Sequence, residues 1–188
     1  MIDFRAASEA LAELISQVSD DDLTRRTPCA EYTVADLLMH VDEGATGFTA
    51  VADGDVSGPA VVGVGDETAR LGVADHVRDL ARAWLDDNAW VGDSDVGGLE
   101  LPSETWGKIA LTEVIVHGWD LAVATGRGFA PPEHLVRACH DHVVVFVPEA
   151  PIPELWGTQV TIGAVSLIDR TVAAAGRDPR SWHLVPPS

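Results

Sequence analysis

One run of twelve residues, LTEVIVHGWDLA at 111–122, constrains the fold more than any other part of the chain. Its side chains are apolar almost all round, and the exceptions are Glu113, His117 and Asp120, spaced i, i+4 and i+7. Because each helical residue advances by about 100°, these three side chains fall within about 60° of one another. The run therefore predicts a mostly buried helix that carries a single polar stripe.

Two interpretations of this stripe are open from its spacing. It can be the solvent side of the helix, with Glu113 and His117 forming an ordinary i, i+4 pair. Alternatively, a glutamate oxygen and a histidine nitrogen at this spacing can converge on one metal ion inside a helical bundle. Two ligands do not make a site, so a third ligand has to come from another helix.

The rest of the chain also follows a helical pattern. Thr33 and Asp36 resemble a capping box at the start of a helix, and Gly126 can adopt the left-handed conformation that ends one. A Gly-rich loop is expected at 54–66, and VGGLEL at 96–101 predicts a short strand or hairpin. No alternating βα pattern is seen, so the sequence predicts an all-α four-helix bundle with a short C-terminal helical extension. The expected helices cover 4–19, 33–52, 67–86, 103–125, 131–147 and 161–175.

The best candidate for a third ligand is His40, in VADLLMHV on the second expected helix. It shares a helix face with Leu37 and Gly44 and is expected to point inward. A lone inward histidine is more often a hydrogen-bonded core residue than a ligand. Its value as a ligand therefore depends on its pairing with Glu113 and His117.

Composition narrows the classes of partner. The 188 residues include 30 acidic and 12 basic side chains, which gives a formal net charge of -18, so nucleic acid and anionic membranes are not expected partners. No apolar stretch approaches the length of a membrane span, and the first residues do not resemble a secretory signal. The hydrophobic share of 46% supports one compact unit. The two cysteines are far apart in sequence and form no CxxC pair, a pattern that is typical of a reduced, cytoplasmic protein with two free thiols, and one disulfide is the alternative.

Other residues with reactive side chains are weaker candidates. Cys29 could approach the mouth of the bundle as a reactive or substrate-contacting thiol, or it could be a small buried apolar residue. His140 and His142 flank Asp141, but i, i+2 positions lie on opposite sides of a helix and make a poor chelate. Trp119 is expected in the core, with a place along a pocket as the alternative. No partner spacing supports a role for His76, His134 or His183.

Three stretches resemble a known family: TPCAEYTVADLLMHV at 27–41, LTEVIVHGWDLAVATG at 111–126 and GRDP at 176–179. They are similar to the actinobacterial branch of the DinB/YfiT-like metal-binding helical bundles, related to the N-terminal domain of mycothiol-dependent maleylpyruvate isomerase. The resemblance spans nearly the whole chain. It implies a DinB-like bundle in which one histidine of the second helix and an E-x3-H pair of a later helix hold a divalent metal.

Matched motif to motif, the resemblance implies His40, Glu113 and His117 as the metal ligands. Asp120 lies one turn beyond His117 and either orients that imidazole through its free N–H or has no metal role. Zinc is the expected ion, although nickel, iron, cobalt or manganese suit the same donors. Three protein ligands leave an open position, at which a bound water or thiol would become more acidic.

The resemblance implies a mycothiol-dependent, or low-molecular-weight thiol-dependent, transferase or isomerase that acts on a small electrophile. A non-enzymatic metal-binding or small-ligand-binding bundle is the second hypothesis. A third hypothesis is that the polar stripe binds no metal. Residues 1–128 are expected to form the metal-binding bundle, with 129–188 packed on it as an extension. The full isomerase has a separate C-terminal domain, for which 129–188 are too few residues, so the maleylpyruvate reaction itself is not expected. A homodimer is also left open.

Overall fold

The computed structural model describes residues 1–29, 31–55, 64–163 and 165–182. Within these ranges the chain is helical apart from one small hairpin, which confirms the predicted all-α class. None of the helices described is both long and apolar enough to cross a membrane. The helices are α1 (Arg5–Ser16), α2 (Val34–Asp53), α3 (Glu67–Ala83), α4 (Ser103–Thr125), α5 (Glu133–Phe146) and α6 (Leu167–Ala174).

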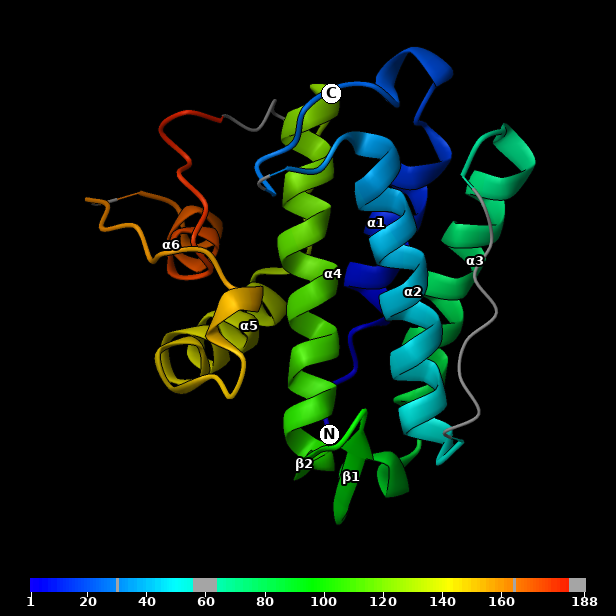
Figure 1. Cartoon of the computed structure of the whole chain (residues 1–188), viewed down its shortest axis with the longest axis vertical. Coiled ribbons are helices and arrows are strands. Elements are labelled where there is room, and N and C mark those ends of the chain that lie inside the picture. The colour runs from blue at the N-terminus through cyan, green and yellow to red at the C-terminus, as the bar shows by residue number, and fades with distance from the viewer. Residues whose placement is uncertain (30, 56–63, 164, 183–188) are drawn as a thin grey trace.

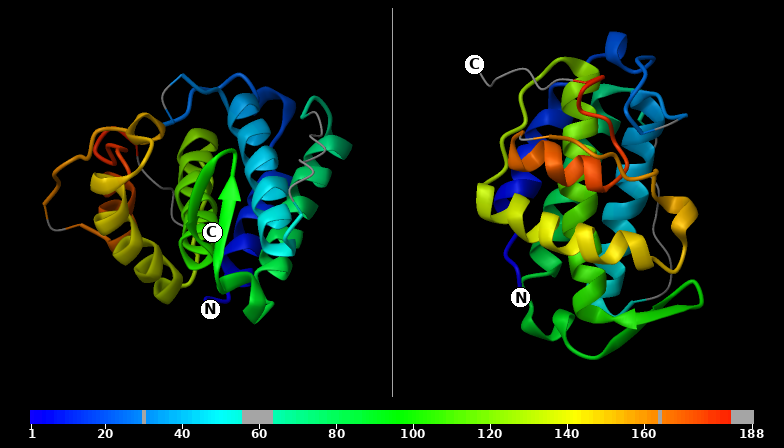
Figure 2. Two further views of the ribbon diagram at one scale, coloured as in Figure 1. Left: turned by 60° about the horizontal axis from the view of Figure 1, so that its bottom comes forward. Right: turned by 90° about the vertical axis from the view of Figure 1, so that its left-hand side faces the viewer.

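Helices α1 to α4 form the four-helix bundle, and α5 and α6 lie outside it (Figure 1). In the bundle α3 packs against α1 and α2, while α4 packs against the same two helices from the other side. Helices α5 and α6 pack on each other and on α4, and they run across the direction of α4 in the side view of Figure 2. Helix α4 is therefore covered by both parts of the molecule.

This central position explains why α4 is apolar almost all round. A helix that is enclosed on all sides has no solvent face on which polar residues would be favoured. Gly118 on α4 lets Phe129 approach, since a Cβ atom at this glycine would lie 2.3 Å from the phenyl ring. Gly126 ends the helix at φ 69°, in the left-handed conformation predicted from the sequence.

The start of α2 is fixed by the predicted capping box. The Thr33 hydroxyl accepts a hydrogen bond from the Asp36 backbone N–H at 3.3 Å, and the Asp36 carboxylate accepts one from the Thr33 N–H at 2.9 Å. A defined first turn sets which residues of the helix face α4. His40 lies on the face that meets α4.

The hairpin and the last helix show where sequence patterns were right and wrong. Strands β1 (Asp93–Val96) and β2 (Leu99–Pro102) pair around Gly97 and Gly98, both at positive φ, so the VGGLEL hairpin is confirmed. The prediction of a helix from 161 was wrong, because α6 begins only at Leu167. Val160, just before the expected start, instead donates its N–H to the Ala173 carbonyl of α6 at 2.9 Å. Of the expected loop at 54–66, positions 56–63 lie outside the described residues.

Candidate metal centre

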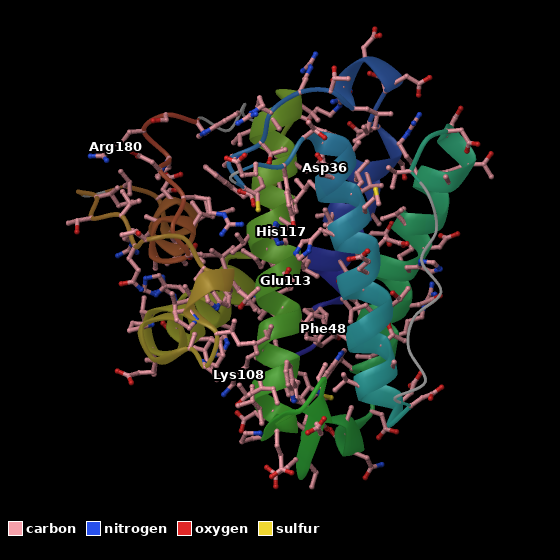
Figure 3. All side chains as sticks on the ribbon, in the orientation of Figure 1. Asp36, Phe48, Lys108, Glu113, His117 and Arg180 are labelled. Atoms are coloured by element: carbon pink, nitrogen blue, oxygen red, sulfur yellow. The ribbon has the colours of Figure 1, made fainter. Side chains whose placement is uncertain are left out.

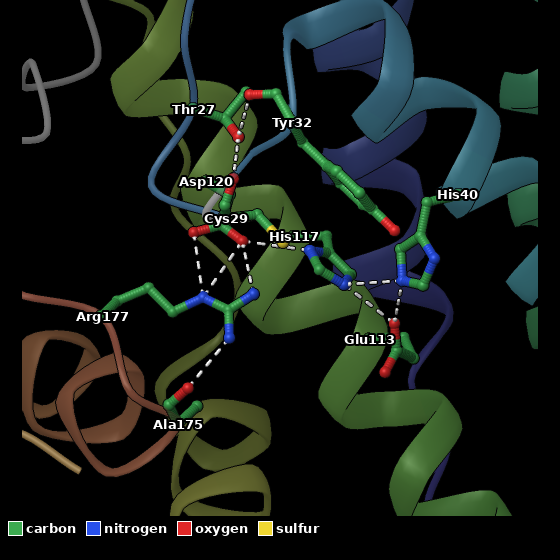
Figure 4. A network of polar contacts seen from close by, with 9 residues as sticks. All are labelled: Thr27, Cys29, Tyr32, His40, Glu113, His117, Asp120, Ala175 and Arg177. Carbon is green, nitrogen blue, oxygen red and sulfur yellow. Dashed lines mark hydrogen bonds and ion pairs between the residues drawn. The ribbon is translucent and has the colours of Figure 1, made fainter. Parts of the chain in front are cut away.

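The three residues predicted as metal ligands meet at one point between α2 and α4 (Figure 4). His40 Nε2 lies 3.2 Å from Glu113 Oε2 and 3.1 Å from His117 Nε2, and the last two atoms are 2.9 Å apart. Ligand atoms around a tetrahedral zinc ion are about 3.3 Å from one another, given bonds of about 2.0 to 2.2 Å. The donor types and their spacing therefore fit a small divalent ion.

The polar stripe on α4 does not face solvent, so the solvent-face interpretation is wrong. The side chain of Asp120 is 0% exposed and that of His117 is 6% exposed, whereas Glu113 and His40 are 26% and 37% exposed. Exposure increases from Asp120 towards His40. The triad of His40, Glu113 and His117 is consequently closed on the Asp120 side and open on the other.

Asp120 fixes the tautomer of His117. The Nδ1–H of His117 donates to Asp120 Oδ2 at 3.0 Å, because a carboxylate can only accept. In a neutral His117 the lone pair of Nε2 then points at the carboxylate oxygen of Glu113. Two electron pairs at 2.9 Å repel each other unless a proton or a cation lies between them.

Without a metal ion, a proton fills this role. Burial disfavours the charged imidazole, but the charge of Glu113 and the hydrogen bonds to Asp120 and Glu113 outweigh it and raise the pKa of His117 to about 9. Burial alone would raise the pKa of Glu113, but the charge and the hydrogen bonds of His117 and His40 hold it well below its usual range. The cluster is therefore built around a positive charge.

Asp120 is in turn paired with Arg177, a contact that the sequence analysis missed. Arg177 Nη2 donates to Asp120 Oδ2 at 3.0 Å, its Nε lies 3.3 Å from both oxygens, and its Nη1 donates to the Ala175 carbonyl at 2.9 Å. Both side chains are buried, at 8% and 0% exposure. A carboxylate in an otherwise apolar helix signals a buried cationic partner, and this signal could have directed attention to the arginine in GRDP.

A close approach of two glycines brings Arg177 to this position. Gly176 has φ 86°, and its backbone lies against Gly157, where an added Cβ on Gly176 would be 2.4 Å from the backbone of Gly157. Side chains at either glycine would push the two segments apart. The C-terminal segment thus reaches the polar stripe of α4 only because both positions lack a Cβ.

A cavity of about 660 Å³ opens beside the triad. Its walls come from the segment before α2, from α2, α4 and the hairpin, from the end of α5 and the segment that follows it, and from the residues after α6. Figure 3 shows Phe48 on α2, closer than Glu113 and His117 to the hairpin end of the molecule. The triad therefore occupies one wall of a space large enough for a small-molecule ligand.

Cys29 lies in the wall of this cavity and is half-buried, so it is near the mouth of the bundle and is not a fully buried core residue. Its sulfur, with a nitrogen of His117 and an oxygen of Asp120, forms a second group of donor atoms within 4.8 Å of one another. Burial and the nearby carboxylates raise the pKa of this thiol against the opposing charge of Arg177. The cysteine is thus a neutral thiol at neutral pH.

Apart from Cys29, the weaker candidates that the structure describes do not converge with the triad. His142 stacks on Phe146 with the ring centres 4.8 Å apart, and burial lowers its pKa to about 4. Trp119 is fully buried in the core and is not among the cavity residues described, as its core interpretation predicted. His76 does have a partner, Asp42, at 2.7 Å, whereas His183 lies outside the described residues.

Comparison with known proteins gives one family and a fold. The family model described as the mycothiol maleylpyruvate isomerase N-terminal domain matches residues 4–122. Uncharacterized proteins of two Mycobacterium tuberculosis strains, CDC 1551 / Oshkosh and ATCC 25618 / H37Rv, are 34% identical over 124 residues. That match covers 64% of this chain and 64% of each relative, which is less than two thirds of their length.

Two solved structures of mycothiol-dependent maleylpyruvate isomerase share the fold. One matches with a TM-score of 0.57 at 17% identity, over 77% of this chain and 68% of the other. The second, a histidine-to-alanine mutant, matches with a TM-score of 0.63 at 16% identity, over 98% of this chain and 92% of the other. The second match includes the C-terminal segment, so the length of 129–188 does not by itself argue against a counterpart there.

Proposed function

Because the chain belongs to the family of the mycothiol maleylpyruvate isomerase N-terminal domain, we propose that it is a metal-dependent enzyme of thiol chemistry. His40, Glu113 and His117 would hold a divalent ion, with zinc as the expected metal. The enzyme would join mycothiol, or a related low-molecular-weight thiol, to a small electrophile, or use the thiol to isomerise it. Residues 1–128 would form the metal-binding unit and 129–188 its packed extension.

One observation carries this proposal: three donor atoms of the right types meet within 3.2 Å on the wall of a cavity of about 660 Å³. A bundle core can hold such polar atoms only if their charges are compensated. A structural histidine–carboxylate pair would need one imidazole, whereas this cluster has two and is open to the cavity. Both features favour a ligand-binding site over a structural contact.

The protein residues around the triad have separable tasks. A divalent ion held by two imidazoles and one carboxylate lowers the pKa of a thiol or water that it binds. Asp120 holds His117 in the tautomer that presents Nε2 to the site, and Arg177 balances the charge of Asp120. Tyr32 lines the cavity beside His40, and burial raises its pKa, so its hydroxyl remains a hydrogen-bond donor for a bound substrate.

Metal content tests the first half of the proposal. Protein purified without a His tag and reloaded with zinc should carry about one ion per chain by elemental analysis, and His40→Ala and His117→Ala should lose it. His134→Ala is the matched control, because this histidine is exposed on α5 and has no place in the triad. A wild-type protein that holds no stoichiometric metal after reloading would show that the proposed function is wrong.

Thiol binding tests the second half. Calorimetry of the metal-loaded protein with mycothiol should show binding that the His117→Ala variant lacks, and a panel of electrophiles should then reveal turnover. Binding of metal and thiol without turnover of any electrophile would instead identify a non-enzymatic metal-binding and ligand-binding bundle. An absence of thiol binding would remove the thiol-dependent part of the proposal.

A further inference from the structure

Away from the triad the cavity is lined mainly by aromatic and aliphatic side chains. Phe48 of α2 and Trp106 of α4 lie with ring centres 6.2 Å apart, and Phe146 and Trp156 form a second pair at 6.1 Å. The indole N–H of Trp106 donates to the Ser94 carbonyl at 2.9 Å, so this ring offers the cavity its apolar surface. Such walls favour ligands with rings or branched chains.

Outside the triad, the described lining of the cavity also lacks a free positive charge. Among the residues that the structure describes, Arg177 is the one arginine or lysine in the lining, and its guanidinium is already bound to Asp120 and to the Ala175 carbonyl. Positions 30, 56–63, 164 and 183–188, which are not described, contain neither arginine nor lysine. Glu113 adds a carboxylate to the lining. A ligand carboxylate placed against the apolar walls would therefore be buried without a cationic partner, which is costly.

We propose that the second substrate of this site is a neutral, apolar electrophile, such as an aromatic or branched-chain enone, and not a carboxylate-bearing one. The inference rests on the proposed function, since it assigns the substrate class of the same cavity. A dicarboxylate such as maleylpyruvate would find no unpaired arginine or lysine here. The apolar body of the substrate lies against the two aromatic pairs, and its reactive end is directed towards the triad and the Tyr32 hydroxyl.

For an enone the reaction balances without an oxidant or a further reactant. The thiol S–H bond breaks, a C–S bond forms at the β-carbon, and the carbon–carbon double bond becomes single. The proton released by the thiol ends on the α-carbon. Negative charge that develops on the carbonyl oxygen during the addition can accept a hydrogen bond from the Tyr32 hydroxyl.

The test uses two saturated ketones that bind without reacting. These are 4-phenylbutan-2-one and its ring para-carboxylate, 4-(3-oxobutyl)benzoate, which differ by one negative charge. Calorimetry is carried out on the full chain as purified and again after chelation, so that an ion cannot ligate the carboxylate. We expect the neutral ketone to bind at least about tenfold more tightly in both preparations. Equal binding, or tighter binding of the carboxylate, would overturn the inference.

Two matched substitutions assign the discrimination to the cavity. Ile152→Arg places a cation at the cavity rim and should improve the affinity for the carboxylate at least about fivefold. Its control, Val145→Arg, lies on an exposed part of α5 outside the described lining and should leave that affinity unchanged.

Trp156→Ala removes part of the apolar wall and should lower the affinity for the neutral ketone by about fivefold or more. Its control, Leu71→Ala on α3, lies outside the described lining and should leave that affinity unchanged. Equal effects of a substitution and its control would place binding elsewhere and reject the inference.

These outcomes separate the inference from the proposed function. If the protein binds metal and mycothiol but prefers the carboxylate, the proposed function stands and the proposed substrate class is wrong. If the protein prefers the neutral ketone but binds neither metal nor thiol, the cavity still takes apolar ligands and the proposed enzymatic function is wrong.

Discussion

Two contacts between imidazole and carboxylate cross from α2 to a neighbouring helix, and they differ in the number of imidazoles and in their access to the cavity. His76 of α3 lies 2.7 Å from Asp42 of α2, as one ring facing one buried carboxylate. His40 of α2 meets both Glu113 and His117 of α4. The first contact involves one imidazole. The second brings two imidazoles and a carboxylate together, and it opens into a cavity.

The comparison teaches that residue type and burial alone do not identify a metal site. Both contacts join α2 to another bundle helix, and both place a histidine that is partly exposed, at 30% for His76 and 37% for His40. Only the second adds another imidazole and a buried carboxylate, Asp120, behind it. The surplus of electron-pair donors is what favours a cation there.

The largest expected difference between the two contacts is in metal affinity. His117→Ala should weaken binding of zinc more than about 100-fold, since it removes a proposed ligand together with that ligand's hydrogen bond to Asp120. His76→Ala should change the affinity by less than about threefold while it lowers the free energy of unfolding. Competition with a chromogenic chelator measures the first quantity and urea denaturation the second. Similar losses of affinity in the two variants would remove the distinction drawn here.

A smaller effect is expected from the carboxylate behind the triad. Asp120→Asn keeps the shape of the side chain but removes the charge that balances Arg177 and polarises His117, so zinc affinity should fall by about 10 to 100-fold. Asp42→Asn is the matched change at the other contact and should leave the affinity within about threefold. An unchanged affinity in Asp120→Asn would show that Asp120 has no part in metal binding.

The dependence on pH gives a further contrast. Folding raises the pKa of His117 from about 6.5 to about 9, so this group's contribution to the stability of the metal-free protein is fully present below pH 6.5 and is lost as pH rises through 9. Metal has to displace that proton, and zinc affinity should therefore rise about tenfold per pH unit up to about pH 9. Imidazole NMR shifts of the metal-free protein, assigned with His117→Ala, report the pKa directly. A value near 6.5 would contradict the expected competition.

The smallest effect is expected at Cys29. Its sulfur lies within 4.8 Å of donor atoms of His117 and Asp120, but the latter is already held by Arg177. Cys29→Ser should therefore change zinc affinity by less than about threefold if the ion is held, as we propose, by the triad that includes His40 and Glu113. A loss comparable to that of His117→Ala would instead assign the ion to the group that contains Cys29.

Much of the fold was predictable because its signals are local. The capping box at Thr33, the left-handed Gly126 and the Gly-Gly turn of the hairpin each act over a few residues, and each was found where the sequence indicated. The start of the last helix was predicted too early. Val160 bonds to Ala173 of α6, and such a pairing between distant positions has no local signature.

For the candidate site, the sequence by itself determined that Glu113, His117 and Asp120 share one side of an apolar helix, because the helical period is fixed by the backbone. Only the tertiary structure decided that this side faces inward, that His40 reaches the same point from α2, and that Arg177 neutralises Asp120 from the far end of the chain. The reason is physical. Periodicity fixes angles within one helix, whereas the burial and the partners of a charged side chain depend on which other elements pack against it.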